Sequence, residues 1–159
     1  MDLYEEFFKV IAALNEDQTP YLVVGGIAMA FHDEPRFTRD IDFACPVSAL
    51  EEFERAVRRV GFFRSTEPWQ FPNTAISLHR FIKVSGEDHL LLDLLVSAEH
   101  PFLDMFGKAV TDSSGAGAVR IVSKEDLVWL KSLRGSDQDQ VDIRRLENDA
   151  NRENGQGGE

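Results

Sequence analysis

Residues 23–43 constrain the fold of this chain more than any other stretch. Their sequence, VVGGIAMAFHDEPRFTRDIDF, begins as an apolar run, breaks at Gly25 and Gly26, and continues into a short segment rich in helix-forming residues. It ends in Asp40 and Asp42, which alternate with apolar residues. Side chains two positions apart on a strand point to the same face of a sheet. The stretch therefore predicts a strand, a tight turn, a short helix and a second strand that presents two carboxylates on one face.

These residue types are suited to a phosphate and a metal ion. A glycine pair lets backbone N–H groups approach a phosphate closely. Carboxylate oxygens are the protein ligands that Mg²⁺ prefers, and two of them side by side can share metal ions. We therefore predict a site for a nucleoside triphosphate with Mg²⁺ or Mn²⁺ around Asp40 and Asp42. The alternative is that both carboxylates lie on a solvated strand face.

A third carboxylate interrupts an apolar run later in the chain. Residues 89–96, HLLLDLLV, are typical of a central strand buried on both faces, and Asp93 is the one acidic residue among them. A buried charge needs a partner such as a metal or a cation. Asp93 can complete a metal site with the first two aspartates, or accept the proton of an attacking hydroxyl. The alternative is a salt bridge at the end of a strand.

The remaining sequence pattern predicts one α/β (α+β) domain, a small mixed sheet with flanking helices and two further C-terminal helices. We expect the domain to span residues 1–148 and residues 149–159 to form a disordered tail. Ser48, with Glu51 three residues later, has the pattern of a helix-capping box. The predicted helices are 2–14, 27–31, 48–60, 101–110, 124–134 and 137–148, and the predicted strands are 21–24, 38–44, 74–84, 89–96 and 119–122, with a loop at 112–117.

Charge and composition narrow the classes of partner. The formal net charge is −11, so no general excess of positive charge is available for binding extended duplex nucleic acid. The single cysteine, Cys45, excludes an internal disulfide and is expected to be a packed, inert thiol. We find neither a signal-peptide pattern nor an apolar run long enough for a membrane span. A cytoplasmic location without membrane contact is the expectation.

The motifs together resemble a known family. The segment GG-x-A-M-A-F-H, followed by R-x-T-x-D-I-D-F and by the isolated aspartate of LLLDLLV, is similar to the minimal nucleotidyltransferases of the DNA-polymerase-beta-like superfamily. Within it the chain most resembles the AbiEii-like group, whose members include toxins of toxin–antitoxin systems. The end of the chain resembles that group's pattern of a lysine-bearing helix, an arginine and an aspartate-rich helix start, here Lys124, Lys131, Arg134, Asp139 and Asp142.

The resemblance implies an enzyme and assigns roles to its residues. Asp40, Asp42 and Asp93 would be catalytic and would bind the metal, with Asp93 as third ligand or general base. The nucleotide would contact Gly25, Gly26, Thr38, Arg39, Lys131 and Arg134. The alternative for Lys131 and Arg134 is that both are solvated helix charges. One position departs from the pattern: many members have Ser or Thr after the glycine pair, where this chain has Ile27.

Two functional hypotheses follow from the sequence. The first is a metal-dependent nucleotidyltransferase that moves NMP from an NTP to a hydroxyl of RNA, protein or a small molecule, as the toxin partner of an antitoxin protein. The second is a non-catalytic module that keeps the fold and binds a nucleotide or partner. A sugar- or antibiotic-modifying enzyme is disfavoured, because the chain has little room for an acceptor domain. Trp69 and Phe71 either cover the site or anchor a loop.

Overall fold

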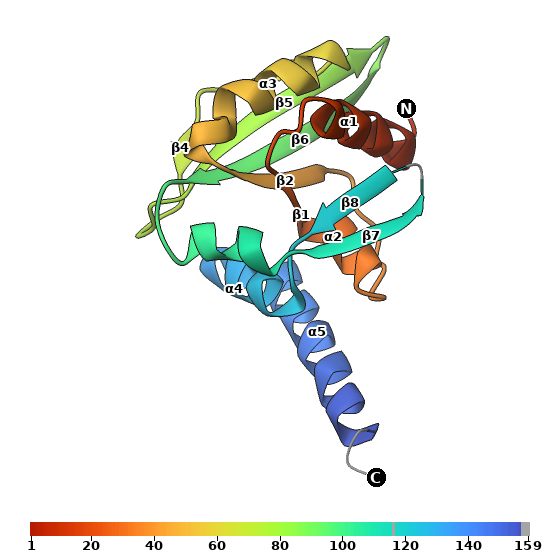
Figure 1. Ribbon diagram of the computed structural model, residues 1–159, viewed down its shortest axis with the longest axis vertical. Coiled ribbons are helices and arrows are strands. Elements are labelled where there is room, and N and C mark those ends of the chain that lie inside the picture. The colour runs from red at the N-terminus through yellow and green to blue at the C-terminus, as the bar shows by residue number, and fades with distance from the viewer. Residues whose placement is uncertain (116, 157–159) are drawn as a thin grey trace.

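A mixed sheet runs through the centre of the computed structural model, which describes residues 1–115 and 117–156 (Figure 1). In the described chain it has eight strands in the order β3-β5-β6-β2-β1-β8-β7, with β4 paired to β5. Parallel pairs join β2 to β6 and β1 to β8, and the other pairs are antiparallel. The predicted small mixed sheet with flanking helices is confirmed. The strands are β1 Leu22–Val24, β2 Ile41–Pro46, β3 Phe63–Arg64, β4 Trp69–Gln70, β5 Ser77–Ser85, β6 Asp88–Ser97, β7 Val110–Gly115 and β8 Gly117–Ile121.

Helices cover the sheet, and α4 and α5 pack together at one end of the molecule, with the end of α5 projecting outward (Figure 1). The Ser123 hydroxyl accepts a hydrogen bond from the backbone N–H of Asp126, so the predicted cap of α4 is confirmed. Gly135, with φ +67°, ends α4 and allows the sharp turn into α5. The α-helices are α1 Leu3–Glu16, α2 Gly25–Phe31, α3 Leu50–Arg59, α4 Lys124–Arg134 and α5 Asp137–Gln156, with 3-10 turns η1 Val47–Ala49 and η2 Phe102–Lys108.

Among the residues that the structure describes, no helix combines the length and the apolar character needed to cross a membrane.

Strand β2 lies between β1 and β6 and separates the apolar core from a polar face. Its alternating residues Ile41, Phe43 and Cys45 are fully buried. The ring of Phe43 lies 5.9 Å from that of Phe7 on α1 and 5.6 Å from that of Phe53 on α3, measured between centroids. These contacts fix β2 against the two helices. The opposite face of β2 is therefore free to present Asp42 on the other side of the sheet.

Three strand predictions differ from the structure. The strand predicted over 38–44 begins at Ile41, so Asp40 lies just before it. Residues 62–73, for which the sequence predicts neither helix nor strand, contain β3 and β4, each two residues long and paired with β5. The expected loop at 112–117 is largely the hairpin of β7 and β8. Two-residue strands show no periodicity, and the polar sequence of β7 gives no apolar alternation, so neither carried a signal.

Helix ends also differ. The capping box at Ser48 is wrong: η1 occupies that position and α3 begins at Leu50, without a side-chain cap bond. The short helix expected over 101–110 is the 3-10 turn η2. The last helix passes its expected end and reaches Gln156; Lys124 Nζ on α4 donates a hydrogen bond to Asp149 at 2.6 Å, which holds this extension to the domain. The division into a domain and a tail stays a prediction.

The aromatic contacts of β2 predict a large stability effect. Phe43→Ala should lower the free energy of unfolding by about 3–5 kcal/mol, because it removes a buried ring and leaves a cavity. Phe37→Ala is the matched control, since the side chain of Phe37 is 80% exposed; its effect should stay within about 0.5 kcal/mol. Urea denaturation measures both. Equal effects would show that Phe43 does not anchor the sheet.

Candidate active site

A row of side chains crosses four neighbouring strands on the polar face of the sheet. Val24 on β1 pairs with Asp42 on β2, and Asp42 pairs with Asp93 on β6. Asp93 in turn pairs with Arg80 on β5. Residues directly opposite each other on neighbouring strands have their side chains on the same face, about 5 Å apart at Cβ. The register alone thus brings two of the three predicted catalytic aspartates side by side, with an arginine next to them.

The glycine pair packs directly against this row. Gly25 has φ +67°, and a Cβ atom there would lie 2.2 Å from Asp42 Oδ2. A Cβ at Gly26 would lie 2.6 Å from Thr38 Oγ1. Both distances are impossible without movement, so the turn from β1 into α2 requires glycine at both positions. Ile27, the next residue, is fully buried in the core, so its side chain does not face this turn.

The aspartates repel one another. Removal from water, then the charges of Asp93 and Asp40, raise the pKa of Asp42 to about 7. Removal from water and the charge of Asp93 also raise the pKa of Asp40. Burial, and then the neighbouring like charges, disfavour the ionised form of both aspartates, a cost that a proton or a cation would relieve. The three carboxylates are of the type that suits a hard divalent cation.

Asp93 itself is held by Arg80. Arg80 Nε lies 2.7 Å from Asp93 Oδ1, and Nη2 lies 2.9 Å from Oδ2, so both carboxylate oxygens accept a hydrogen bond from one guanidinium. The Arg80 guanidinium also lies over the Trp69 ring, 5.2 Å from its centroid. The sequence predicts that a buried Asp93 needs a metal or a cation as its partner. In the structure that partner is Arg80. In the described residues, no three His, Cys, Asp or Glu side chains are arranged to hold a metal ion.

A buried ionic network links α4 and α5 beside the row. Lys131 is 4% exposed and donates to Asp142 at 2.8 Å, which contradicts the alternative of a solvated charge. Arg134 donates two hydrogen bonds to Asp139, at 2.6 and 2.7 Å. Burial alone would raise the pKa of Asp139, but hydrogen bonds from Arg134 and Ser136 lower it to about 2. Asp139 is therefore ionised, and the network is one of full charges.

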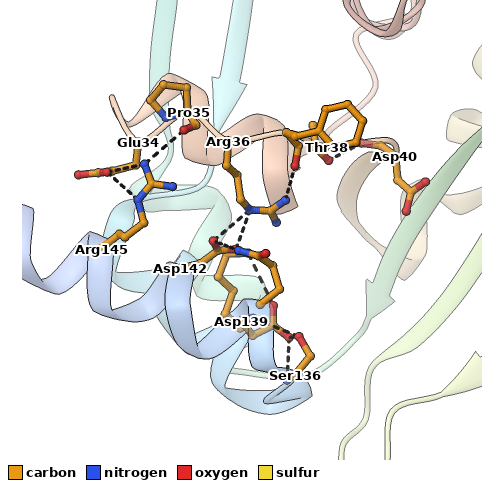
Figure 2. Close-up of polar contacts among 12 residues, drawn as sticks. Glu34, Pro35, Arg36, Thr38, Asp40, Ser136, Asp139, Asp142 and Arg145 are labelled. Atoms are coloured by element: carbon orange, nitrogen blue, oxygen red, sulfur yellow. Dashed lines mark hydrogen bonds and ion pairs between the residues drawn. The ribbon is translucent and has the colours of Figure 1, made fainter.

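The segment before β2 is tied to the same network. Arg36 Nε donates to both oxygens of Asp142, at 3.0 and 3.1 Å. Arg145 on α5 donates to Glu34 and to the carbonyl of Pro35. Figure 2 shows these links from α5 to the segment that leads to Thr38 and Asp40. The first aspartate of the pair is thus positioned by contacts with the C-terminal helix rather than by the sheet.

Two adjoining depressions share Asp42, Asp93 and Arg134 and together contain all nine predicted site residues. One has an apolar wall, which includes Phe71. The other is polar and includes Arg80, which the sequence did not single out. The apolar depression is lined by Val24, Gly25, Asp42, Phe71, Leu78, Asp93, Leu95, Leu127, Leu130, Lys131, Arg134 and Asp139; the polar one by Gly26, Arg36, Phe37, Thr38, Arg39, Asp40, Asp42, Arg80, Asp93 and Arg134.

Comparison with known proteins shows which family and which solved structures this chain resembles. The sequence pattern of the family described as "Nucleotidyl transferase AbiEii toxin, Type IV TA system" matches residues 10–134. No curated protein matches the chain by sequence.

Among solved structures, a protein of Thermotoga maritima described as a nucleotidyltransferase superposes with a TM-score of 0.61 at 14% identity, over 92% of each chain. ANT(2″)-Ia in complex with adenylyl-2″-tobramycin superposes with a TM-score of 0.58 at 20% identity, over 88% of this chain and 84% of that one. At these identities both show a shared fold.

The contact between Gly25 and Asp42 predicts that Gly25→Ala is damaging. The left-handed backbone at this position alone costs an alanine about 1–2 kcal/mol, and the clash with Asp42 adds to it. Gly107→Ala is the control, because a Cβ there has no neighbour within 4 Å. Urea denaturation should show a loss of at least about 1 kcal/mol for the first variant only. A neutral Gly25→Ala would mean that the turn is not as close to Asp42 as described.

The raised pKa of Asp42 predicts a pH-dependent stability. An unfolded aspartate has a pKa of about 3.9, so between about pH 4 and pH 7 the folded protein holds a proton that the unfolded chain releases. The stability contributed by this proton is present below pH 4 and lost as the pH rises through 7. Asp42→Asn should therefore be more stable than wild type, by a margin that grows from pH 5 to pH 7 and is constant above pH 7.5.

Thermal unfolding of both proteins in EDTA, at several pH values, measures this margin. Asp33→Asn is the matched control for the loss of one carboxylate, since Asp33 is exposed and lies outside both depressions; the growth of the margin with pH should be larger for Asp42→Asn than for this control. A margin for Asp42→Asn that shrinks or stays constant as the pH rises would contradict the raised pKa.

Proposed function

The chain belongs to the AbiEii nucleotidyltransferase toxin family, and from this premise we propose that it transfers a nucleoside monophosphate from an NTP to a hydroxyl acceptor. The hydroxyl oxygen attacks the α-phosphorus, the bond between the α-phosphorus and the bridging oxygen breaks, and pyrophosphate leaves. The hydroxyl proton passes to a base on the protein or to solvent. The observation that carries this proposal is the row of Asp42 and Asp93 on paired strands, with Asp40 close enough to affect the charge of Asp42.

We propose Mg²⁺ or Mn²⁺ as the cofactor, held by Asp40 and Asp42 with Asp93 as the third ligand. Such an ion, when bound, neutralises charge on the triphosphate and favours attack on it. The carboxylate types fit this role, and the burial of Asp42 beside the charges of Asp93 and Asp40, which raises its pKa, supports a cation at this point. Asp93 fits only after Arg80 releases it. Once free, one Asp93 oxygen can also take the proton of the attacking hydroxyl.

The phosphates would lie between the glycine turn and the α4–α5 network. Arg36, Lys131 and Arg134 face two carboxylates, Asp139 and Asp142, so this group carries one net positive charge. Arg134 is the member best placed to reach a ligand, because its side chain is 54% exposed and lines both depressions. Thr38, Arg39 and Gly26 line the polar depression, and Gly25 lines the adjoining apolar one. With Ile27 buried, phosphate recognition would depend on these groups.

The acceptor would be a hydroxyl of RNA, a protein or a small molecule, and we propose that the protein acts in the cytoplasm as the toxin of a toxin–antitoxin pair. The family description supports the toxin role. The competing proposal is a non-catalytic module that binds nucleotide without transferring it, which the buried Ile27 and the occupied Asp93 favour.

Transfer of radioactive label separates the two proposals. The protein is incubated with four α-³²P-labelled NTPs, Mg²⁺ or Mn²⁺ and a bacterial extract, and the labelled macromolecules are separated on gels. We expect label in the acceptor with wild type and at least about a 100-fold loss with Asp42→Asn, because a metal ligand is removed. Asp33→Asn should transfer label as wild type does, since it removes an exposed carboxylate that lies outside both depressions. NTP binding without label transfer, in any extract fraction, would support the module instead.

A further inference from the structure

Arg80 occupies the atoms of Asp93 that the proposed reaction needs. The two hydrogen bonds, at 2.7 and 2.9 Å, form a bidentate pair in which one planar guanidinium faces one carboxylate. Pairs of this kind are among the strongest and most geometrically specific in proteins. As long as Arg80 and Asp93 are paired, the Asp93 oxygens face Arg80. In this arrangement the described residues contain no three-carboxylate group placed to hold a metal ion.

Two features show that this pair belongs to the site. Arg80 and Asp93 are register partners on β5 and β6, so the backbone places them opposite each other on the face that carries Asp42. The Arg80 side chain is 32% exposed and lines the polar depression together with Asp40. Trp69, on the short strand β4, provides the guanidinium with a second partner that does not depend on Asp93.

We propose that Arg80 is a positioning residue that holds Asp93 in the nucleotide-free protein and must leave it before Asp93 can act. This inference rests on the proposed function. Arg80 is the cation that is hydrogen-bonded to Asp93, in a group of three carboxylates that act on one another, so its release is favoured when another positive charge replaces it. A divalent cation bound at the aspartates would supply that charge. The triphosphate that comes with it offers Arg80 new anionic partners in the same depression.

The consequence is that a divalent cation without nucleotide binds weakly. In the free protein the ion must compete with Arg80 for Asp93, and the released guanidinium has no phosphate to contact. The ion-paired Arg80 and Asp93, here called the clamp, would thus couple metal binding to nucleotide binding.

Mn²⁺ binding to the protein without nucleotide, measured by electron paramagnetic resonance, tests the clamp. Arg80→Gln should bind Mn²⁺ at least about tenfold more tightly than wild type, because it frees one carboxylate ligand. Arg80→Lys should lie between them, since an ammonium cannot engage both oxygens as a planar fork does. Arg39→Gln removes the same charge from the same depression without freeing Asp93, so its gain should be below about threefold.

The double variant Arg80→Gln/Asp93→Asn should lose the gain, because Asp93 is the ligand released. The proposal is overturned if Arg80→Gln binds Mn²⁺ no more tightly than Arg39→Gln, or if the double variant keeps the gain. Circular dichroism checks folding; if Arg80→Gln is unfolded, Arg80→Lys carries the test and must still exceed Arg39→Gln. The Mn²⁺ measurement contains no nucleotide, so it can be interpreted even if the protein transfers no label. If the protein transfers label but Arg80→Gln does not bind Mn²⁺ more tightly, the clamp is overturned and the proposed nucleotidyltransferase function is not.

Discussion

The contact between Gly25 and Asp42 fixes how closely the glycine turn approaches the strand that carries the central carboxylate of the site. A chain that leaves a strand with φ +67° at Gly25 passes so close to Asp42 that no side chain fits between them. The turn that begins α2 and the strand that carries Asp42 are therefore held at one fixed distance. The strand register places the next residues of the site relative to Asp42, because Asp42 pairs with Asp93 and Asp93 pairs with Arg80. The steric contact and the strand register together thus align the elements that present the glycine turn, two carboxylates and a guanidinium.

Packing of the apolar face of strand β2 offsets the energetic cost of the carboxylate on its other face. Burial of Asp42, and then the charges of Asp93 and Asp40, raise the pKa of Asp42, so its ionised form opposes folding. On the other face Phe43 packs between the rings of Phe7 and Phe53. Asp42, a carboxylate with a raised pKa, is therefore the direct chain neighbour of Phe43, whose ring packs into the core. Sites that concentrate like charges commonly depend on such support from the core.

The candidate site residues could be located from the sequence, and their partners could not. Alternation marks Asp40 and Asp42, and an apolar run marks Asp93, because periodicity and local contrast are properties of the chain itself. Arg80 is one of several charged residues on a strand, and its role appears only when β5 and β6 pair in one register. The burial of Lys131 likewise depends on how α4 meets α5. The polar hairpin strand β7 shows no apolar pattern, so pairing with β8 defines it.

The three aspartates are held by interactions of different kinds. Asp42 and Asp93 lie within paired strands, so backbone hydrogen bonds and packing fix them. Asp40 precedes β2, on a segment that α5 holds through Arg36 and Arg145. Ion pairs between side chains are longer and more adaptable than a strand ladder, and those with exposed partners weaken as salt rises. The position of Asp40 therefore depends on the docking of α5, whereas that of Asp42 is set by the strand pairing, so the site combines two carboxylates held by the sheet with one held through the C-terminal helix.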